Sequence, residues 1–171
     1  MRPALLLFAL LVAQPLLHAD DSARRYLGKN DAWFASTEAK QVATIILSFQ
    51  CDAGGWPKNT DTISKSYSGD RAKLQPTFDN KATVDELRFM ARMVNATKAE
   101  AYRNSFDRGL AYVLKAQYAN GGWPQFFPLR KGYYDRITFN DGAMVRVLEF
   151  VREVGRDERY AFLDAKLRAS C

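Results

Sequence analysis

The segments QCDAGGWPKN (Gln50–Asn59) and QYANGGWPQF (Gln117–Phe126) share Gly-Gly-Trp-Pro, preceded by a glutamine at the same spacing. They lie 67 positions apart in the chain. A second pair of segments, TFDNKATVDELRF (Thr77–Phe89) and TFNDGAMVRVLEF (Thr138–Phe150), repeats with an offset of 61. Self-similarity at this spacing indicates a repeat architecture in which neighbouring units bury a shared core. The chain is therefore expected to contain two copies of one structural unit.

Each unit is expected to contain two helices. Apolar residues recur at helical spacing over residues 98–117, and residues 31–50 are their counterpart in the first unit. The segment Thr97-Lys98-Ala99-Glu100 has the pattern of a capping box and predicts where the helix at 98–117 starts. A later helix in each unit follows the Thr-Phe-Asp/Asn segment, and a fifth helix is expected to begin near Arg156. The predicted apolar stripes of the two later helices are Val84, Leu87, Ala91 and Val94, and Met144, Val147, Leu148 and Val151.

Gly-Gly-Trp-Pro is expected where the first helix of each unit ends. Glycine permits the left-handed backbone that closes a helix, and proline prevents the helix from resuming. The tryptophan can pack over this turn, and the glutamine amide can connect the loop to the neighbouring unit. The alternative is that the tryptophans are platforms on which sugars stack.

The N-terminal residues have the features of a secretory signal peptide. Arg2 precedes an apolar run from Ala4 to Leu17, and a small residue, Ala19, stands before the expected cleavage point. The run is shorter than the roughly 20 residues that span a bilayer, although a membrane anchor is the alternative. We therefore expect a signal peptide at 1–19, one domain at 20–171, and a secreted or periplasmic protein.

Composition narrows the possible chemistry. The full chain carries a formal net charge of +6, which suits either a polyanionic partner or a simply solvated surface. Its one histidine, His18, lies in the predicted signal peptide, so a Ser–His catalytic triad is excluded and a zinc site is not expected. Two cysteines, Cys51 and Cys171, form no disulfide framework, and whether they pair stays open.

Three motifs together are more specific than the repeat alone. The segments ILSFQCDAGGWPKN, TFDNKATVDELRFMA and GGWPQFFPLRKGYYDRITFNDGAMVRVLEFV resemble the family 10 polysaccharide lyases, which are pectate lyases. The resemblance extends from about Trp33 to Lys166. It implies an all-α fold, an (α/α)3 toroid built from helix pairs, of which this chain would supply two units and the start of a third, as if truncated. It also implies calcium-dependent β-elimination of polygalacturonate by a monomer, without nucleic acid or stable membrane association.

The resemblance also suggests site residues. Asp79 matches an active-site carboxylate of the family, and Asp141 matches a calcium-associated one. Asn80 lies beside the site and is added as a calcium-ligand candidate, together with the same two aspartates. Calcium prefers several oxygen ligands, and a hard cation on a uronate carboxylate makes the neighbouring C5 proton easier to remove. The alternative is that Asp and Asn at these positions only cap the helices that follow.

Basic and aromatic residues near the motifs complete the expected site. From charge and position we infer that Lys58, Asn59 and Arg136 face the carboxylates of the substrate. The alternative for Lys58 and Arg136, as for Arg130 and Lys131, is an ordinary solvated charge. Tyr133 and Tyr134 either stack on sugar or pack at the rim of the core.

The sequence leaves two other functions open. The resemblance implies that an arginine is the catalytic base, and no arginine of this chain matches it by motif. A non-catalytic protein that binds acidic polysaccharide with calcium is therefore the alternative. Gln-x-x-x-Gly-Gly-Trp also occurs in triterpene cyclases, but the Asp-x-Asp-Asp acid motif of an isoprenoid toroid is missing from the sequence.

Overall fold

A computed structural model describes residues 22–137 and 139–171 of the chain. The predicted signal peptide at 1–19 lies outside the described residues. The α-helices are α1 (Asp31–Phe34), α2 (Thr37–Ser48), α3 (Val84–Thr97), α4 (Glu100–Lys115), α5 (Ala143–Arg156) and α6 (Ala165–Ala169). Short 3-10 helices lie at Ala23–Tyr26, Arg71–Lys73, Asp79–Lys81, Tyr133–Asp135, Asn140–Gly142 and Glu158–Tyr160. Within the described residues the only β-structure is an isolated bridge between Thr77 and Phe126, so the all-α prediction is confirmed.

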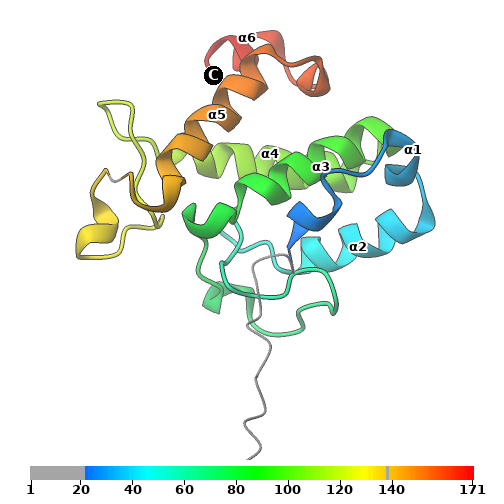
Figure 1. Ribbon diagram of the computed structural model, residues 1–171, viewed down its shortest axis with the longest axis horizontal. Helices are drawn as coiled ribbons and strands as arrows, with labels where there is room; N and C mark the ends of the chain where they lie inside the picture. Colours follow the sequence, from blue (N-terminus) through cyan, green and yellow to red (C-terminus); the bar gives the residue numbers. More distant parts are fainter. Residues whose placement is uncertain (1–21, 138) are drawn as a thin grey trace, which may run out of the picture.

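Helix α3 is the central element of the fold. Lys98 and Ala99 join it to α4, and the two helices lie side by side (Figure 1). Helices α1 and α2 pack on one side of this pair, and α5 contacts α3 from the other side and carries α6. These stacked helix pairs are the arrangement of an α/α toroid.

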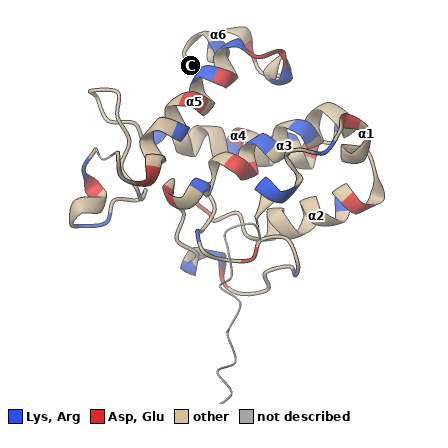
Figure 2. Cartoon of the chain, viewed as in Figure 1, with Lys and Arg blue, Asp and Glu red and all other residues tan. Residues whose placement is uncertain are grey.

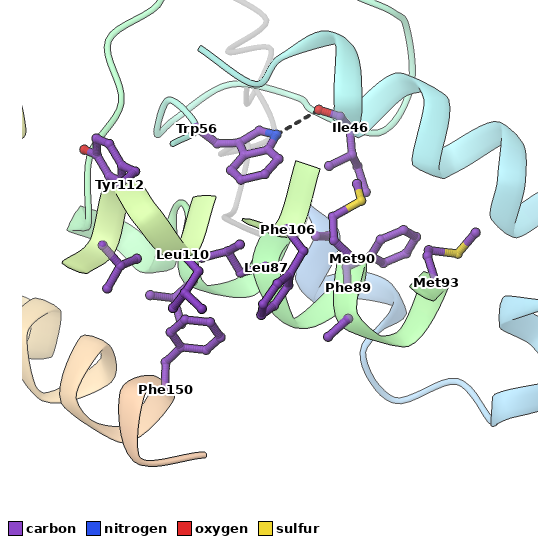
Figure 3. Close-up of a cluster of buried hydrophobic side chains, with 14 of the residues drawn as sticks. Ile46, Trp56, Leu87, Phe89, Met90, Met93, Phe106, Leu110, Tyr112 and Phe150 are labelled. Carbon is purple, nitrogen blue, oxygen red and sulfur yellow. Dashed lines mark hydrogen bonds between the residues drawn. The ribbon is translucent and has the colours of Figure 1, made fainter. Parts of the chain in front are cut away.

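The core lies where α2, α3, α4 and α5 meet. Figure 3 shows Ile46 from α2, Leu87 from α3, Phe106 from α4 and Phe150 from α5, each fully buried. Burying a side chain of this size contributes about 1.5–3 kcal/mol relative to exposure, so this shared cluster is what holds the two units together.

Several predicted helix boundaries are wrong. The helix expected over residues 31–50 is broken into α1 and α2, because the Ser36 side chain accepts a hydrogen bond from the Ala39 N–H and starts a new helix. The capping box at Thr97 does not form. Thr97 is instead the last residue of α3, and α4 begins at Glu100 without a side-chain cap. The fifth helix predicted near Arg156 is replaced by a 3-10 turn and the short α6.

The two Gly-Gly-Trp-Pro segments have the predicted structural role. The Trp56 indole N–H donates to the Ile46 carbonyl at 2.8 Å, and Trp123 donates to Val113 at 2.9 Å, in each case ten residues earlier. Both tryptophans are buried, so neither ring is available to stack on a sugar, and that alternative is wrong. Gly54 is required because α4 approaches closely: a Cβ there would lie 2.5 Å from the Arg108 carbonyl oxygen.

The equivalent apolar positions of the two units differ in exposure. In the first unit Phe78, Val84 and Leu87 are buried, with Phe78 packed against Tyr112 of α4 and Leu87 close to Gly109 of the same helix. Their counterparts in the second unit, Phe139, Val145 and Leu148, are 72%, 40% and 56% exposed. The prediction that Leu148 belongs to a buried stripe is therefore wrong, while the stripe of the first unit, Val84, Leu87, Ala91 and Val94, is confirmed.

Three further sequence-level questions are answered by the structure. Cys51 and Cys171 are both free thiols. No helix among the described residues combines the length and the apolar composition needed to cross a membrane. Basic and acidic residues are interspersed over helices and loops (Figure 2).

Candidate functional site

The residues leading into α3 and α5 repeat one unusual backbone shape. Each helix is preceded by a three-residue 3-10 turn, Asp79–Lys81 or Asn140–Gly142. The middle residue of each turn has a left-handed conformation, with φ 49° and ψ 33° at Asn80 and φ 49° and ψ 18° at Asp141. Such backbone is uncommon outside glycine, and asparagine and aspartate tolerate it best. The Asp/Asn composition of the two motifs therefore has a local structural reason as well as a chemical one.

These polar residues do not cap the helices that follow. Neither α3 nor α5 has a side-chain hydrogen bond at its N-cap, which is Thr83 in the first case and Gly142 in the second. The Asp79 carboxylate accepts instead from the N–H of the adjacent Asn80 at 2.9 Å. The capping alternative is therefore wrong for Asp79 and Asn80.

The Gly-Gly-Trp-Pro turn holds the entry to α3 in place. Thr83 has a positive φ of 70°, which is strained for a β-branched residue. Its hydroxyl accepts a hydrogen bond from the Trp56 N–H at 2.9 Å and donates to the Thr77 carbonyl at 2.9 Å. These two bonds compensate for the strain and connect the two motifs of the first unit. They also bring the residues after Trp56 alongside the Asp79–Lys81 turn.

Four predicted site residues meet in pairs as a result. The Lys58 ammonium forms an ion pair with the Asp79 carboxylate, which is only 7% exposed. The Asn80 amide donates to the Asn59 side-chain oxygen at 2.8 Å. Asn59 also has a left-handed backbone, with φ 54°. The structure thus brings together Lys58, Asn59, Asp79 and Asn80, which come from segments about 20 residues apart in sequence.

The loop before α5 adds aromatic residues to these pairs. Tyr133 stands close enough to both Asp79 and Asp141 for their charges to act on it. A hydrogen bond with Tyr134 is the main cause that raises the pKa of Tyr133, followed by lost hydration and the charge of its neighbours, including the two aspartates. Helix α5, which follows the Asn140–Gly142 turn, also contacts the Asp79–Lys81 turn, so the two repeated turns lie in one region of the molecule.

The sequence analysis did not predict Phe126 or Gln125 as residues near the site, and it left Arg130 as a possible solvated charge. The Lys58 ammonium lies 5.4 Å from the Phe126 ring centroid, and the Arg130 guanidinium lies 4.9 Å from the same centroid. Gln125 is buried and holds the units together through its backbone, because its carbonyl accepts from Phe78 N–H and the Thr77 hydroxyl. The repeat itself could have indicated Gln125, since it occupies the position that Lys58 has in the first unit.

Arg136 is not brought into these pairs. Its side chain is exposed, and no described residue accepts a hydrogen bond from its guanidinium. Asp141 is exposed in the Asn140–Gly142 turn that precedes α5.

The side chains present fit a calcium ion only in part. Among the described residues no group of three or more His, Cys, Asp and Glu side chains is placed to hold a metal. Asp79 already has a cation, Lys58, on one oxygen and the Asn80 N–H on the other. Asn80 and Asp141 are oxygen donors of the kind calcium binds, so ligands from outside the chain would have to complete the coordination.

Two cavities lie away from this site. One, of about 350 Å³, is lined by Phe49, Asp61 and residues 65–69. The other, of about 440 Å³, is lined by Asp31, Arg92, Asn95, Ala96 and Arg159. The Arg92 side chain there is occupied by Asp31 and the Leu27 carbonyl, so this cavity offers no free charge from that residue.

Comparisons with known proteins agree with the repeat and the motifs. The family model described as pectic acid lyase matches residues 50–169. A point mutant of a family 10 polysaccharide lyase from Cellvibrio cellulosa, solved in complex with trigalacturonic acid, is 29% identical with a TM-score of 0.67. The alignment covers 90% of this chain and 48% of that chain. A second structure of a family 10 polysaccharide lyase from the same organism is 30% identical with a TM-score of 0.67, covering 87% and 46%.

The present chain therefore spans about half the length of these solved chains. Among curated proteins no sequence matches it. The family model nevertheless covers well over half of the chain, including both Gly-Gly-Trp-Pro segments and both entry turns. This chain belongs to the pectic acid lyase family.

Proposed function

We propose that this protein acts on polygalacturonate as a pectate lyase, by calcium-dependent β-elimination. The observation that carries the proposal is the meeting of Lys58, Asn59, Asp79 and Asn80 at the entry to α3. Family membership and the solved relative's complex with trigalacturonic acid support the choice of substrate. The chain spans only about half of that relative, so the activity of this polypeptide is what the experiment has to test.

β-Elimination requires positive charge near the carboxylate of the uronate that loses its C5 proton. In β-elimination a base removes the C5 proton and the bond from C4 to the glycosidic oxygen breaks, leaving a double bond between C4 and C5. The C5 proton is weakly acidic while the adjacent carboxylate keeps its full negative charge. When bound, calcium would lower that charge and so stabilise the transition state.

The chain's own residues would prepare this site. Asn80 and Asp141 would supply oxygens to the ion, and Asp79 would join them through the carboxylate that Lys58 now holds. Lys58 would hold the nearly buried Asp79 carboxylate in place through their ion pair and would also bind a substrate carboxylate, as Asn59 would by hydrogen bonding. We also propose that Arg136, which is exposed in the loop before α5, binds a substrate carboxylate.

The test is formation of the unsaturated, ultraviolet-absorbing product from polygalacturonate. We expect product with calcium, none after chelation, and recovery when calcium is restored. Asp79→Asn and Asp141→Asn should each lower the rate about 100-fold or more while leaving the fold intact by circular dichroism. Product that forms equally well in chelator would contradict the calcium requirement.

A non-catalytic binder of acidic polysaccharide is the second candidate. Arg130 lies in the aromatic loop before α5. Its guanidinium packs on the Phe126 and Tyr134 rings and donates to Gln75, so it is not positioned as a catalytic base. This function predicts calcium-dependent binding of polygalacturonate without any unsaturated product. Turnover that a chelator abolishes would reject it.

We further infer from the N-terminal pattern that residues 1–19 direct export and that the domain at 20–171 is a secreted or periplasmic monomer. The mass of the exported protein would show whether residues 1–19 are removed. Sedimentation of the mature chain would show whether it is a monomer.

A further inference from the structure

The loop that leads to α5 builds a stack of aromatic rings whose outermost member is open to solvent. Phe126 is buried, and the Tyr134 ring meets it edge-on, with centroids 5.4 Å apart and an interplanar angle of 90°. Tyr133 lies against Tyr134 with a centroid separation of 3.9 Å. Tyr133 is 58% exposed, so the stack begins in the core and ends in a ring that solvent can reach.

A cation lies beside this stack and keeps donors available. The Arg130 guanidinium is 4.9 Å from the Phe126 centroid and 5.3 Å from the Tyr134 centroid. One nitrogen donates to the Gln75 side-chain oxygen at 3.1 Å, which fixes the direction of the group. A guanidinium carries five N–H donors, so most of them are left for a ligand.

The stack connects directly to the candidate site. The Phe126 ring that holds Arg130 also lies 5.4 Å from the Lys58 ammonium, and Lys58 is paired with Asp79. Tyr133 lies in the loop that leads into the Asn140–Gly142 turn, and α5, which follows this turn, contacts the Asp79–Lys81 turn. An exposed ring and an anchored cation therefore border the same pair of repeated turns.

Ordinary packing does not account for the exposed ring. A tyrosine that contributes mainly to the core is buried, as Tyr112 and Tyr160 are in this protein. Tyr133 instead leaves more than half of its surface to water, on a 3-10 turn that Gly132, with φ 119°, introduces. Rings held rigidly at the surface are typical of binding sites, because little conformational entropy is lost when a ligand covers them.

We propose that Tyr133 and Arg130 form a binding subsite for one uronic acid residue next to the Asp79 and Asp141 turns. The Tyr133 ring covers the apolar C–H face of the sugar. The Arg130 guanidinium, directed by Gln75, donates hydrogen bonds to its carboxylate, an arrangement that a neutral sugar would not satisfy. The choice of ligand rests on the proposed function, but the subsite is a binding site in its own right.

The test measures equilibrium binding of trigalacturonate to the full chain by calorimetry, with a chelator present to remove calcium. Wild type should bind without calcium. Tyr133→Ala and Arg130→Gln should each weaken binding by about tenfold or more, whereas Tyr133→Phe, which keeps the ring, should stay within about twofold. Lys131→Gln removes a neighbouring exposed charge and is the matched control for Arg130→Gln. Thermal melting checks that each variant is folded.

The outcomes separate this subsite from the lyase activity. Calcium-free binding that depends on Tyr133 and Arg130 supports the subsite even if no unsaturated product ever forms. Wild-type protein that binds no trigalacturonate in chelator overturns it, as does equal loss on Lys131→Gln. If the protein cleaves polygalacturonate but Tyr133→Ala leaves both binding and KM unchanged, the subsite is rejected and the proposed function stands.

Discussion

At the residue scale, the most unusual ionisable group is Glu86 in the first turn of α3. Its carboxyl is buried, and one of its oxygens finds no partner among the described residues. Burial, and next the charge of the neighbouring Asp85, raises the pKa of Glu86 from 4.5 to about 8. Backbone N–H groups of Ala23 and Thr83 hydrogen-bond to it and lower the pKa, but they do not outweigh burial.

This shift predicts how stability changes with pH. Between pH 4.5 and about 8 the unfolded chain releases the Glu86 proton while the folded chain keeps it, so the free energy of unfolding falls as pH rises. Above about pH 8 both states are ionised and the loss of unfolding free energy is complete, on the order of 5 kcal/mol for a pKa raised from 4.5 to about 8. Glu86→Gln cannot titrate, so its unfolding free energy should change less over this window.

Urea denaturation at several pH values measures the slope. Glu149→Gln, at an exposed position of α5, is the control and should keep the wild-type slope. A slope for Glu86→Gln as steep as that of wild type would show that Glu86 is not the group responsible.

A second residue-scale prediction concerns Lys58. Lys58→Met leaves the nearly buried Asp79 carboxylate without its cation, which should cost about 1–3 kcal/mol of stability near neutral pH. Lys40→Met, which removes an exposed charge on α2, should change stability by less than about 0.5 kcal/mol. Chemical denaturation of the two variants makes the comparison, and equal effects would mean that the ion pair contributes nothing.

At the element scale, the repeated glutamines show how a loop connects one helix pair to the next. The Gln50 amide donates to the Gly54 carbonyl at 2.7 Å and to the Ser105 carbonyl of α4 at 2.9 Å. Its oxygen accepts from the Ser105 hydroxyl and from Arg108. Gln117 keeps the bond to its own loop, Gly121, at 3.1 Å, but is exposed.

The two glutamines therefore give a matched pair of variants. Gln50→Ala should destabilise the fold by about 2–3 kcal/mol, because the buried Ser105 hydroxyl and carbonyl of α4 and the Gly54 carbonyl lose their partner. Gln117→Ala should cost less than about 1 kcal/mol, since water can replace its single bond. Thermal denaturation compares the two, and similar losses would contradict the connecting role of Gln50.

At the scale of the whole molecule, the second unit has an exposed apolar face. The equivalent face of the first unit is buried. Phe139, Val145 and Leu148 are exposed, and they occupy the repeat positions of the buried Phe78, Val84 and Leu87. An exposed apolar surface of this kind promotes association or dye binding, because its burial releases ordered water.

Leucine variants at the equivalent positions test this contrast. Leu87→Ala should cost about 2–5 kcal/mol, as expected for a cavity in the core. Leu148→Ala should leave stability within about 0.5 kcal/mol of wild type and should reduce both fluorescent-dye binding and self-association. Light scattering and dye fluorescence give the second readout, and an unchanged signal would mean that this face is covered in solution.

Much of the fold follows from local patterns in the chain. The repeat, the helical class and the buried stripe of α3 were predictable because periodicity reports which side of a helix faces the core. The break at Ser36 was not, because a side-chain cap competes with continued helix by only about 1 kcal/mol. Leu148 was misplaced for another reason: sequence repeats show that two positions are equivalent, not that both have a covering neighbour.

The residues of the candidate site were predictable from the sequence, but their pairing was not. The sequence and its resemblance to a family indicated Asp79, Asn80, Asp141, Lys58 and Asn59 as residues of one site. That Lys58 pairs with Asp79 and Asn59 with Asn80 depends on the Thr83 bonds to the Gly-Gly-Trp-Pro turn. Phe126 and Arg130 join the site only through packing of the loop before α5.

By itself, the sequence determined the family, the helical repeat and the polar residue types at the two helix entries, because these depend on composition and spacing along the chain. Only the tertiary structure decided which side chains meet, which tryptophans are unavailable to a ligand and which apolar face stays open. Such outcomes depend on contacts between distant segments, whose energies arise when the units pack together and leave no trace in local periodicity.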